Sequence, residues 1–384
     1  MEKKIRLLVN LVDFDAKYQG GINTFATGLL SELKLNKKIT ILTTTTRLNS
    51  IKKIFNGKKF KYIIIKDKNI YTKFLRFLSI ILNSAFIYKI SVKLEYLETF
   101  NLINTNYDVL YCPLTNLRPL NLKIKTVTSI HDIQHYNLPQ NFSFFEKRYR
   151  NLLHTTTIKY SSRIQVSSKF IYKNIAKYFS KKISKKLFII SEGVSQKFFN
   201  NKKKLGNYLF FPAQLWPHKN HLTILKAIKI LNDKYKKKIK IILVGQRYKK
   251  SLPILNFINQ NKELDIEYLG KVSFKKLQKL YINCKIVMCP ALYESSSLTL
   301  LEAIKMSKPV IASDTPPNIE LNSYFKINFF KRDNPFLCAK LINQVWDNNI
   351  LLNKQISFNK KSIGLFYWKE ISKKYKIEFL KILS

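Results

Sequence analysis

Residues 284–313 read CKIVMCPALYESSSLTLLEAIKMSKPVIAS, and this stretch decides the fold. Ile286–Pro290 is a short apolar run with the length of a buried strand. Leu298–Met306 has apolar residues at helical spacing, and Val310–Ala312 has the character of a second strand. A strand, a loop, a helix and a strand in this order predict a βαβ unit. Such units build parallel sheets that bind ligands at the carboxyl ends of their strands.

Two glutamates belong to this unit. Glu294 lies in the predicted loop, and Glu302 follows within the predicted helix. The junction between loop and helix consists of Ser295, Ser296, Ser297 and Leu298. Free backbone N–H groups at a helix N-terminus suit an anion such as a phosphate, and carboxylates beside it can accept hydrogen bonds from hydroxyls. The pattern is therefore consistent with a site for a nucleoside diphosphate sugar, and equally with two solvated glutamates and a serine-capped helix.

The same stretch resembles the Glu-x7-Glu motif of the retaining glycosyltransferases of family 4, which have the GT-B fold. The residues that match the family pattern are Pro290, Tyr293, Glu294, Leu301, Glu302, Ala303, Lys308 and Pro309. The family's Gly-Phe-Gly is replaced by three serines, which bears on the approach of the backbone to the donor sugar. The resemblance implies an α/β fold of two Rossmann-like domains that face an interdomain cleft. It also implies transfer of a hexosyl group from a nucleotide sugar to a hydroxyl, with retention of the anomeric configuration.

The resemblance assigns roles to the residues of the glutamate unit. Glu302 is expected to bind the ribose hydroxyls, Glu294 to bind the donor sugar, and the amides of the serine loop to hold the diphosphate. Because the family is thought to react on one face with assistance from the leaving phosphate, no nucleophile or base is assigned. No metal and no further cofactor are expected, since cationic side chains and helix N-termini would neutralise the diphosphate.

A second donor-binding segment is the loop Ala213–His221, which follows a predicted strand. By resemblance, Lys219 is expected to neutralise the diphosphate as the nucleotide leaves. Gln214 stands where the family has an arginine, so one of the two usual cations is missing. Gly270 and Val272 are expected to line the nucleobase slot through their backbone.

In the first half of the chain, residues 17–21 form a loop after the predicted strand Ile5–Leu11. Gly20 and Gly21 resemble the family's glycine pair near the donor diphosphate. His131 ends another predicted strand and resembles the family histidine that contacts the donor, so it joins Lys219 and Glu294 as a predicted catalytic residue. His135 follows four residues later, but the sequence offers no third ligand for zinc.

The polar run 200–207 is the best candidate for a hinge between two domains. It predicts an acceptor-side domain over residues 1–199 and a nucleotide-sugar domain over residues 200–365. An amphipathic helix over residues 366–384 is expected to pack back on the first domain. At 384 residues, the chain is long enough for two domains with their own cores.

The chain has 69 basic and 23 acidic residues, a formal net charge of +46. Such a charge is typical of proteins that bind nucleic acid or an anionic membrane. Only nine of the basic residues are Arg, the residue that best contacts phosphate and guanine in two places, and no nucleic-acid-binding motif is present. Nucleic acid is therefore an unlikely partner. A basic nucleic-acid-binding protein and a catalytically inactive GT-B subunit remain the alternative functions.

The most apolar stretch is 70–100, and within it Phe77–Tyr88 is predicted to be one helix flanked by lysines and an arginine. Such a helix could pack on the sheet or lie in a membrane interface. No apolar run is long enough to span a bilayer, and the N-terminus lacks the features of a signal peptide. The protein is thus expected to be cytoplasmic, with a saccharide or lipid-linked saccharide as acceptor and a peripheral contact with an anionic membrane as an open alternative.

Overall fold

The computed structural model describes residues 5–15, 20–35, 39–195, 197–199, 205–248 and 250–383. The chain forms two compact units, Met1–Glu192 with Trp368–Ser384, and Gly193–Tyr367. Residues 193–199, which the sequence places in the first domain, thus belong to the second unit, where Phe198 is buried in the core. Residues 17–19 of the predicted glycine loop and residues 200–204 of the predicted hinge lie outside the described residues.

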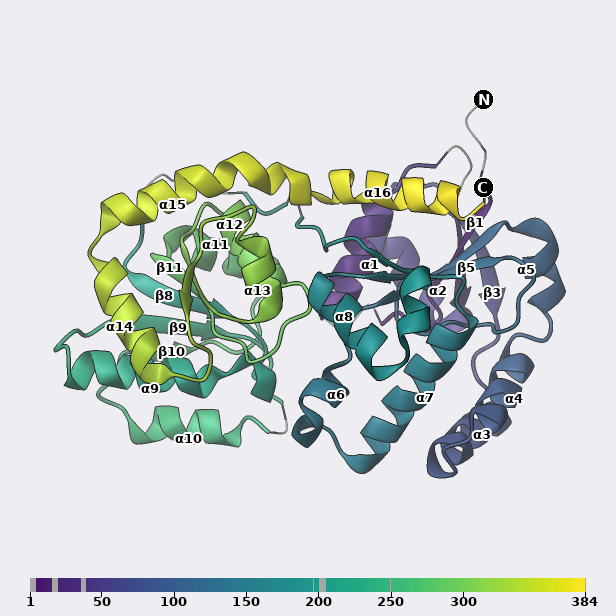
Figure 1. Ribbon diagram of the computed structural model, residues 1–384, viewed down its shortest axis with the longest axis horizontal. Helices are drawn as coiled ribbons and strands as arrows, with labels where there is room; N and C mark the ends of the chain where they lie inside the picture. Colours follow the sequence, from purple (N-terminus) through teal and green to yellow (C-terminus); the bar gives the residue numbers. More distant parts are fainter. Residues whose placement is uncertain are drawn as a thin grey trace. The chain divides into compact units, whose positions relative to one another are not determined.

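In the described part of the first unit, seven parallel strands form one sheet in the order β3-β2-β1-β4-β5-β6-β7. Figure 1 labels β1, β3 and β5 of this sheet. The strands are β1 (Leu7–Asn10), β2 (Thr40–Thr44), β3 (Lys61–Ile65), β4 (Val109–Cys112), β5 (Lys125–Ile130), β6 (Arg163–Val166) and β7 (Leu187–Ile189). The helices are α1 (Gly21–Glu32), α2 (Thr45–Ile54), α3 (Ile70–Ile81), α4 (Ala85–Glu95), α5 (Phe100–Asn106), α6 (Gln134–Asn137), α7 (Phe144–Tyr160), α8 (Lys169–Tyr178) and α16 (Trp368–Lys381). The strand order reverses between β1 and β4, which is the point of a doubly wound sheet where ligands bind.

The last helix, α16, is part of the first unit. Its apolar side buries Trp368, Ile371, Tyr375 and Phe379 in the same core cluster as Phe25 of α1. A glycine makes the close approach of α1 and α16 possible, because a Cβ atom at Gly28 would lie 2.1 Å from the indole nitrogen of Trp368. The helix begins at Trp368, two residues later than the sequence predicts.

The described part of the second unit has a six-stranded parallel sheet in the order β10-β9-β8-β11-β12-β13. Its strands are β8 (Tyr208–Pro212), β9 (Lys240–Val244), β10 (Ile266–Tyr268), β11 (Ile286–Cys289), β12 (Val310–Ser313) and β13 (Asn328–Phe330). Its helices are α9 (His221–Asp233), α10 (Leu252–Gln260), α11 (Phe274–Asn283), α12 (Leu298–Lys305), α13 (Pro316–Leu321), α14 (Pro335–Trp346) and α15 (Asn349–Ser362). Here the strand order reverses between β8 and β11.

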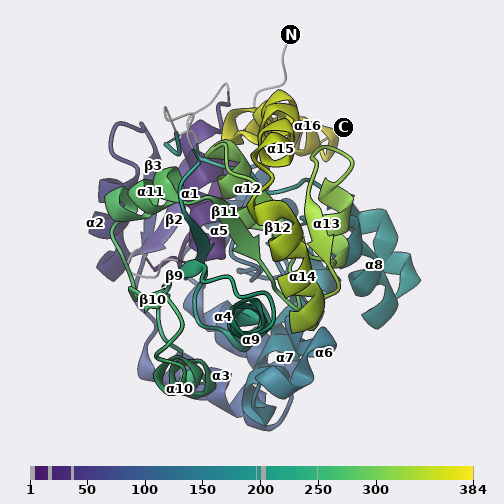
Figure 2. The ribbon, with the colours of Figure 1, turned by 90° about the vertical axis from the view of Figure 1, so that its left-hand side faces the viewer.

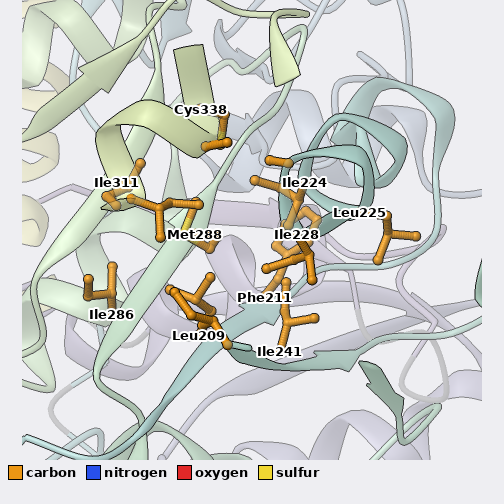
Figure 3. Packing of buried hydrophobic residues seen from close by; sticks show 14 of the residues in the cluster. Leu209, Phe211, Ile224, Leu225, Ile228, Ile241, Ile286, Met288, Ile311 and Cys338 are labelled. Carbon is orange, nitrogen blue, oxygen red and sulfur yellow. The ribbon is translucent and has the colours of Figure 1, made fainter. Parts of the chain in front are cut away.

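Alternation along the strands gives this sheet two apolar faces. Leu209 and Phe211 of β8 pack on one face with Ile224 and Ile228 of α9, as Figure 3 shows. Phe210, between them in sequence, packs on the other face against residues of α11 and α12. Helices α9 and α14 lie side by side on the first face (Figure 2). The predicted βαβ unit is thus β11, α12 and β12, in which both strands are buried and α12 covers one face of the sheet.

The prediction of one helix over Phe77–Tyr88 is wrong. The chain turns after Ile81, where Asn83 has a φ of 50° and the Ser84 hydroxyl accepts a hydrogen bond from the amide of Ile87 at the start of α4. Helices α3 and α4 therefore pack against each other as a hairpin beside α7 (Figure 1). Among the described residues, none of the helices has both the length and the apolar character needed to cross a bilayer.

Candidate functional site

The second unit gathers most of the predicted site residues at the carboxyl edge of its sheet. The loops after β8 and β11 meet there, on either side of the strand-order reversal. Two hydrogen bonds join these loops. The Asn220 side-chain amide donates to the Pro290 carbonyl at 3.1 Å, and the Leu292 amide donates to the His218 carbonyl at 2.8 Å. Asn220 itself has a φ of 61°, a left-handed conformation that asparagine tolerates better than most residues.

Lys219 and Glu294 form an ion pair across this junction. Lys219 ends the short 3₁₀ turn η3 (Pro217–Lys219), and its Nζ lies 2.7 Å from Glu294 Oε1. The two side chains are 23% and 15% exposed, so the pair is shielded but still reached by solvent. A charge pair in this position can exchange partners with an incoming anion, because neither group is sealed in the core.

Glu302 lies on α12 and is held by the second unit's core. The hydroxyl of Tyr281 donates to its Oε2 at 3.0 Å. Burial raises the pKa of Glu302 to about 7, although the tyrosine hydrogen bond opposes this shift. Burial, and then the charge of Glu294, raise the pKa of the Cys289 thiol at the carboxyl end of β11, whereas Lys219 lowers it. Glu294 lies in the loop that follows β11, and Glu302 lies on the helix after that loop.

The serine loop leads directly into α12, which begins at Leu298. Ser297 is the residue before the helix and has a φ of 56°, the left-handed region that favours glycine. Its hydroxyl is hydrogen-bonded to the side chain of Asn318 and does not cap the helix. The interpretation of Ser297 as a simple helix cap is thus not borne out, while Ser295 and Ser296 are half-buried beside it.

Gln214 is tied into an aromatic layer at the same edge. Trp216 Nε1 donates to the Gln214 side-chain oxygen at 2.5 Å, and the indole stacks on Tyr248 with ring centroids 4.3 Å apart. Tyr248 follows β9. The loops after β8 and β9 can approach each other closely because residue 245 is glycine, since a Cβ atom there would lie 2.1 Å from the Ala213 carbonyl oxygen. Gln214, which stands where the family has an arginine, therefore holds the indole of Trp216 in its stack with Tyr248.

The predicted nucleobase segment follows β10. Gly270 has a φ of 64°, and its carbonyl accepts a hydrogen bond from the Gly245 amide at 2.9 Å. The side chain of Val272 packs against the core layer on the α11 side of the sheet. A role of this segment in base binding stays a prediction.

Three predicted residues belong to the first unit. Gly20 precedes α1 and Gly21 is its first residue. His131 is buried at the end of β5, with Nε2 at 2.7 Å from the Pro113 carbonyl and Nδ1 at 3.5 Å from Glu192. Both ring nitrogens thus face protein groups, and the donor contact assigned to this histidine stays a prediction.

His135 is the neighbouring histidine that suggested a metal pair. Its Nε2 is hydrogen-bonded to Asn151 at 2.9 Å, and Arg150 donates to its Nδ1 at 3.2 Å. Arg150 also pairs with Asp132. Among the residues that the structure describes, no three His, Cys, Asp or Glu side chains are grouped as metal ligands.

Sequence reasoning missed the charged groups at the carboxyl edge of the first sheet. Asp13 follows β1 and pairs with Arg118, which follows β4, so this pair also flanks a strand-order reversal. Arg118 lies 3.7 Å from Glu95 of α4. A signal was present, because acidic residues are scarce and Asp13 stands two residues after the first predicted strand. The tyrosine that holds Glu302 gave no comparable signal.

Comparison with known proteins finds similarity to glycosyltransferases. Residues 195–362 match the family model described as glycosyl transferases group 1. The O-antigen chain mannosyltransferase RfbU of Salmonella typhimurium is 29% identical over 216 residues, which are 56% of this chain and 59% of that protein. The uncharacterized glycosyltransferase MJ1178 of Methanocaldococcus jannaschii is 26% identical over 358 residues, 92% of each chain.

The fold has clear relatives among solved structures. HepE of Anabaena, solved in complex with UDP and glucose, superposes with a TM-score of 0.71 at 13% identity, over 98% of this chain and 100% of that one. At this identity the likeness concerns the fold alone. The prediction of an α/β fold of the GT-B type, with two parallel sheets covered by helices, is confirmed.

Proposed function

We propose that this chain, whose residues 195–362 match the group 1 glycosyl transferases, transfers a hexosyl group from a nucleotide-diphosphate sugar to a hydroxyl. The acceptor is a growing glycan or a lipid-linked saccharide of a cell-surface polysaccharide. The transfer retains the anomeric configuration. The similarity to an O-antigen mannosyltransferase favours mannose as the transferred sugar.

The observation that carries the proposal is the Lys219–Glu294 pair at the strand-order reversal of the second sheet. When a diphosphate binds, its oxygens compete with Glu294 for the lysine ammonium. Lys219 then neutralises the leaving group, a contribution that grows as negative charge develops in the transition state. The same exchange frees the carboxylate of Glu294 to accept hydrogen bonds from sugar hydroxyls.

Glu302 would bind the ribose of the donor. Its pKa of about 7 means that neutral and ionised forms coexist near neutral pH. Both forms can accept a hydrogen bond from a hydroxyl, so ribose binding by this residue does not require one protonation state.

The protein would work in the cytoplasm and contact an anionic membrane peripherally.

The decisive experiment measures transfer by Lys219→Met and Glu294→Gln. Each change should lower kcat/KM by roughly 100-fold, the usual loss for one charge-stabilising group. The matched control is the exposed pair of Lys240 and Glu267 in the same unit, joined at 2.8 Å. Lys240→Met and Glu267→Gln should leave transfer unchanged. Near-normal turnover in both site variants would overturn the assignment.

The donor is identified by thermal shift with UDP-, GDP-, ADP- and dTDP-sugars on the wild-type chain. One nucleotide sugar should raise the melting temperature, and Lys219→Met should reduce that rise. If a donor binds but neither hydrolysis nor transfer follows, the protein is an inactive GT-B subunit. Salt-sensitive binding to nucleic acid without any donor response would favour the other alternative.

A further inference from the structure

The α3–α4 hairpin of the first unit carries an unusual amount of exposed apolar surface. The side chain of Phe86 on α4 is 71% exposed, and that of Leu97, just after the end of α4, is 61% exposed. Further exposed apolar side chains on the hairpin are Ile70, Tyr71, Phe74, Phe77, Ile81, Leu82, Ile90 and Leu94. Soluble proteins seldom leave so many apolar side chains together in water, and such patches usually mark an interaction site.

Helix α4 divides this surface from the interior. Its inner side carries Tyr88, Val92 and Glu95, and the Glu95 carboxylate pairs with Arg76 of α3 at 2.5 Å. Its outer side carries Phe86, Lys89, Ile90 and Lys93, which recur at helical spacing. The inner charge is thus used by the fold, whereas the outer side combines apolar residues with two cations.

The outer side of α4 forms one wall of a pocket of about 580 Å³. The residues that line it are Phe86, Lys89, Ile90, Lys93, Leu97, Phe100, Asn101, Pro119, Leu120 and Asn121. This volume falls within the range of small-molecule sites, about 300–1,000 Å³. The lining contains two lysines and no carboxylate, so the pocket suits an apolar group joined to an anion.

The two lysines are available for such an anion. Lys93 is exposed, and Lys89 lies over the ring of Tyr160 at 5.2 Å. Within the described residues, neither ammonium group is in an ion pair with a carboxylate. Lysines that border apolar residues on one helix face are typical of segments at a membrane interface, where the stem is buried and the ammonium meets lipid phosphates.

We propose that this pocket binds the hydrocarbon chain of an anionic membrane lipid, with the lipid phosphate between Lys89 and Lys93. The inference deepens the membrane contact proposed above by naming its site and its ligand class. It rests on that contact and not on the transfer reaction. Lipid binding can therefore be tested with no nucleotide sugar present.

The first test is sedimentation of the full chain with vesicles of phosphatidylcholine, with and without phosphatidylglycerol. Wild-type protein should bind the mixed vesicles and not the neutral ones. The variant with both Lys89→Ser and Lys93→Ser should bind roughly 30-fold more weakly, since each lysine near an anionic surface contributes about a fivefold gain. The matched control carries Lys360→Ser and Lys361→Ser on α15 and should bind as wild type.

The second test separates the pocket from simple adsorption. Titration calorimetry with dodecyl phosphate, below the concentration at which it forms micelles, should show saturable binding, whereas inorganic phosphate should not bind. Ile90→Trp fills the pocket and should abolish dodecyl phosphate binding. Leu351→Ser, at an apolar position of α15 with similar exposure (40% against 37% for Ile90), should not. All variants must keep the wild-type melting temperature and the same response to nucleotide sugars.

Two outcomes overturn the inference. If Ile90→Trp binds dodecyl phosphate and vesicles as well as wild type, the pocket is not the site. If the chain ignores anionic vesicles and instead self-associates through this surface in light scattering, a second copy is its partner. A loss of donor response with intact lipid binding would count against the proposed transferase alone.

Discussion

The two units share a plan, and each has a cation and an anion at its strand-order reversal, yet the two pairs differ in their surroundings. In the first unit, Asp13 after β1 meets Arg118 after β4. In the second, Lys219 after β8 meets Glu294 after β11. The comparison sets a pair that is locked in a buried network against a pair that solvent can reach.

The pair in the first unit is part of a larger network. Arg118 also approaches Glu95, and Lys68 lies 3.2 Å from Asp13 and 3.8 Å from Glu95. The side chains of Arg118 and Glu95 are 3% and 2% exposed. Burial also lowers the pKa of Lys68 to about 8. Moving one member of this network would leave another charge buried without its partner.

The pair in the second unit is smaller and more accessible. Separating Lys219 from Glu294 exposes both groups to solvent or to a ligand, and the energetic penalty is correspondingly low. A charge that can change partners is suited to substrate binding. A charge locked in a network is suited to fixing a loop, here the segment 113–121 that lines the proposed lipid pocket.

The largest expected effect tests the network directly. Arg118→Met removes the cation and leaves Glu95 buried with fewer partners, which should lower the free energy of unfolding by roughly 3–5 kcal/mol. The measurement is urea denaturation of the full chain. The control is Arg6→Met, because the Arg6–Asp108 pair, at 2.6 Å, is far more exposed and should contribute much less to stability. Equal losses in the two variants would erase the distinction between the two kinds of pair.

A second prediction concerns how the stability of the first unit depends on pH. Burial lowers the pKa of His135 to about 3 and that of His154 to about 4. Between these values and the ordinary pKa near 6.5, the unfolded state binds protons that the folded state does not. Stability is therefore complete above pH 6.5 and is lost as the pH falls. At pH 5 each histidine should cost roughly 1–2 kcal/mol.

The second unit supplies a contrast of opposite sign. Because the folded-state pKa of Glu302 is raised to about 7, the folded state holds its proton more tightly, and this residue reduces stability as the pH rises from 4.5 to 7. The stability of Glu302→Gln relative to wild type should thus grow between pH 4.5 and pH 7. His221 in the same unit is no part of this contrast, because burial lowers its pKa to about 3, as it does for the histidines of the first unit. A pH-independent difference in urea denaturation would contradict the assignment.

Local patterns allowed parts of the fold to be predicted. The helix predicted over Leu298–Met306 is present as α12, because its apolar residues recur at helical spacing. The strand predicted over Ile286–Pro290 is present as β11, because a short apolar run between polar segments has few other solutions. The hairpin of α3 and α4 was missed, because its turn at Asn83 and Ser84 interrupts a run that is apolar on both sides.

The site was predictable only in its local parts. Glu294, Glu302 and Lys219 stand in recognisable motifs, and the structure joins Lys219 to Glu294. The partners that define their environment come from distant positions, as Tyr281 does for Glu302 and Glu192 for His131. Spacing along one sequence carries no information about such contacts, because packing between elements creates them.

The smallest expected effect sharpens the comparison at the start of α12. Ser297 has a left-handed backbone where the family pattern has glycine, and its hydroxyl contacts Asn318. Ser297→Ala keeps the backbone strain and loses the contact, whereas Ser297→Gly loses the contact but relieves the strain. Glycine should therefore exceed alanine in unfolding free energy by about 1 kcal/mol. The measurement is urea denaturation of the two variants.

The control for this prediction is Ser307, whose φ of 55° is nearly the same and which follows α12 instead of preceding it. The same order of glycine above alanine is expected there, since the strain has the same origin. Only the changes at Ser297 should also alter donor affinity in a thermal-shift titration. Ser297 lies at the N-terminus of α12, at the carboxyl edge of the second sheet, whereas Ser307 lies beyond the other end of this helix. Alanine and glycine variants of equal stability at both positions would show that backbone strain is not stored at these serines. If the Ser307 variants change donor affinity as much as the Ser297 variants do, the strained backbone at Ser297 has no specific link to the donor site.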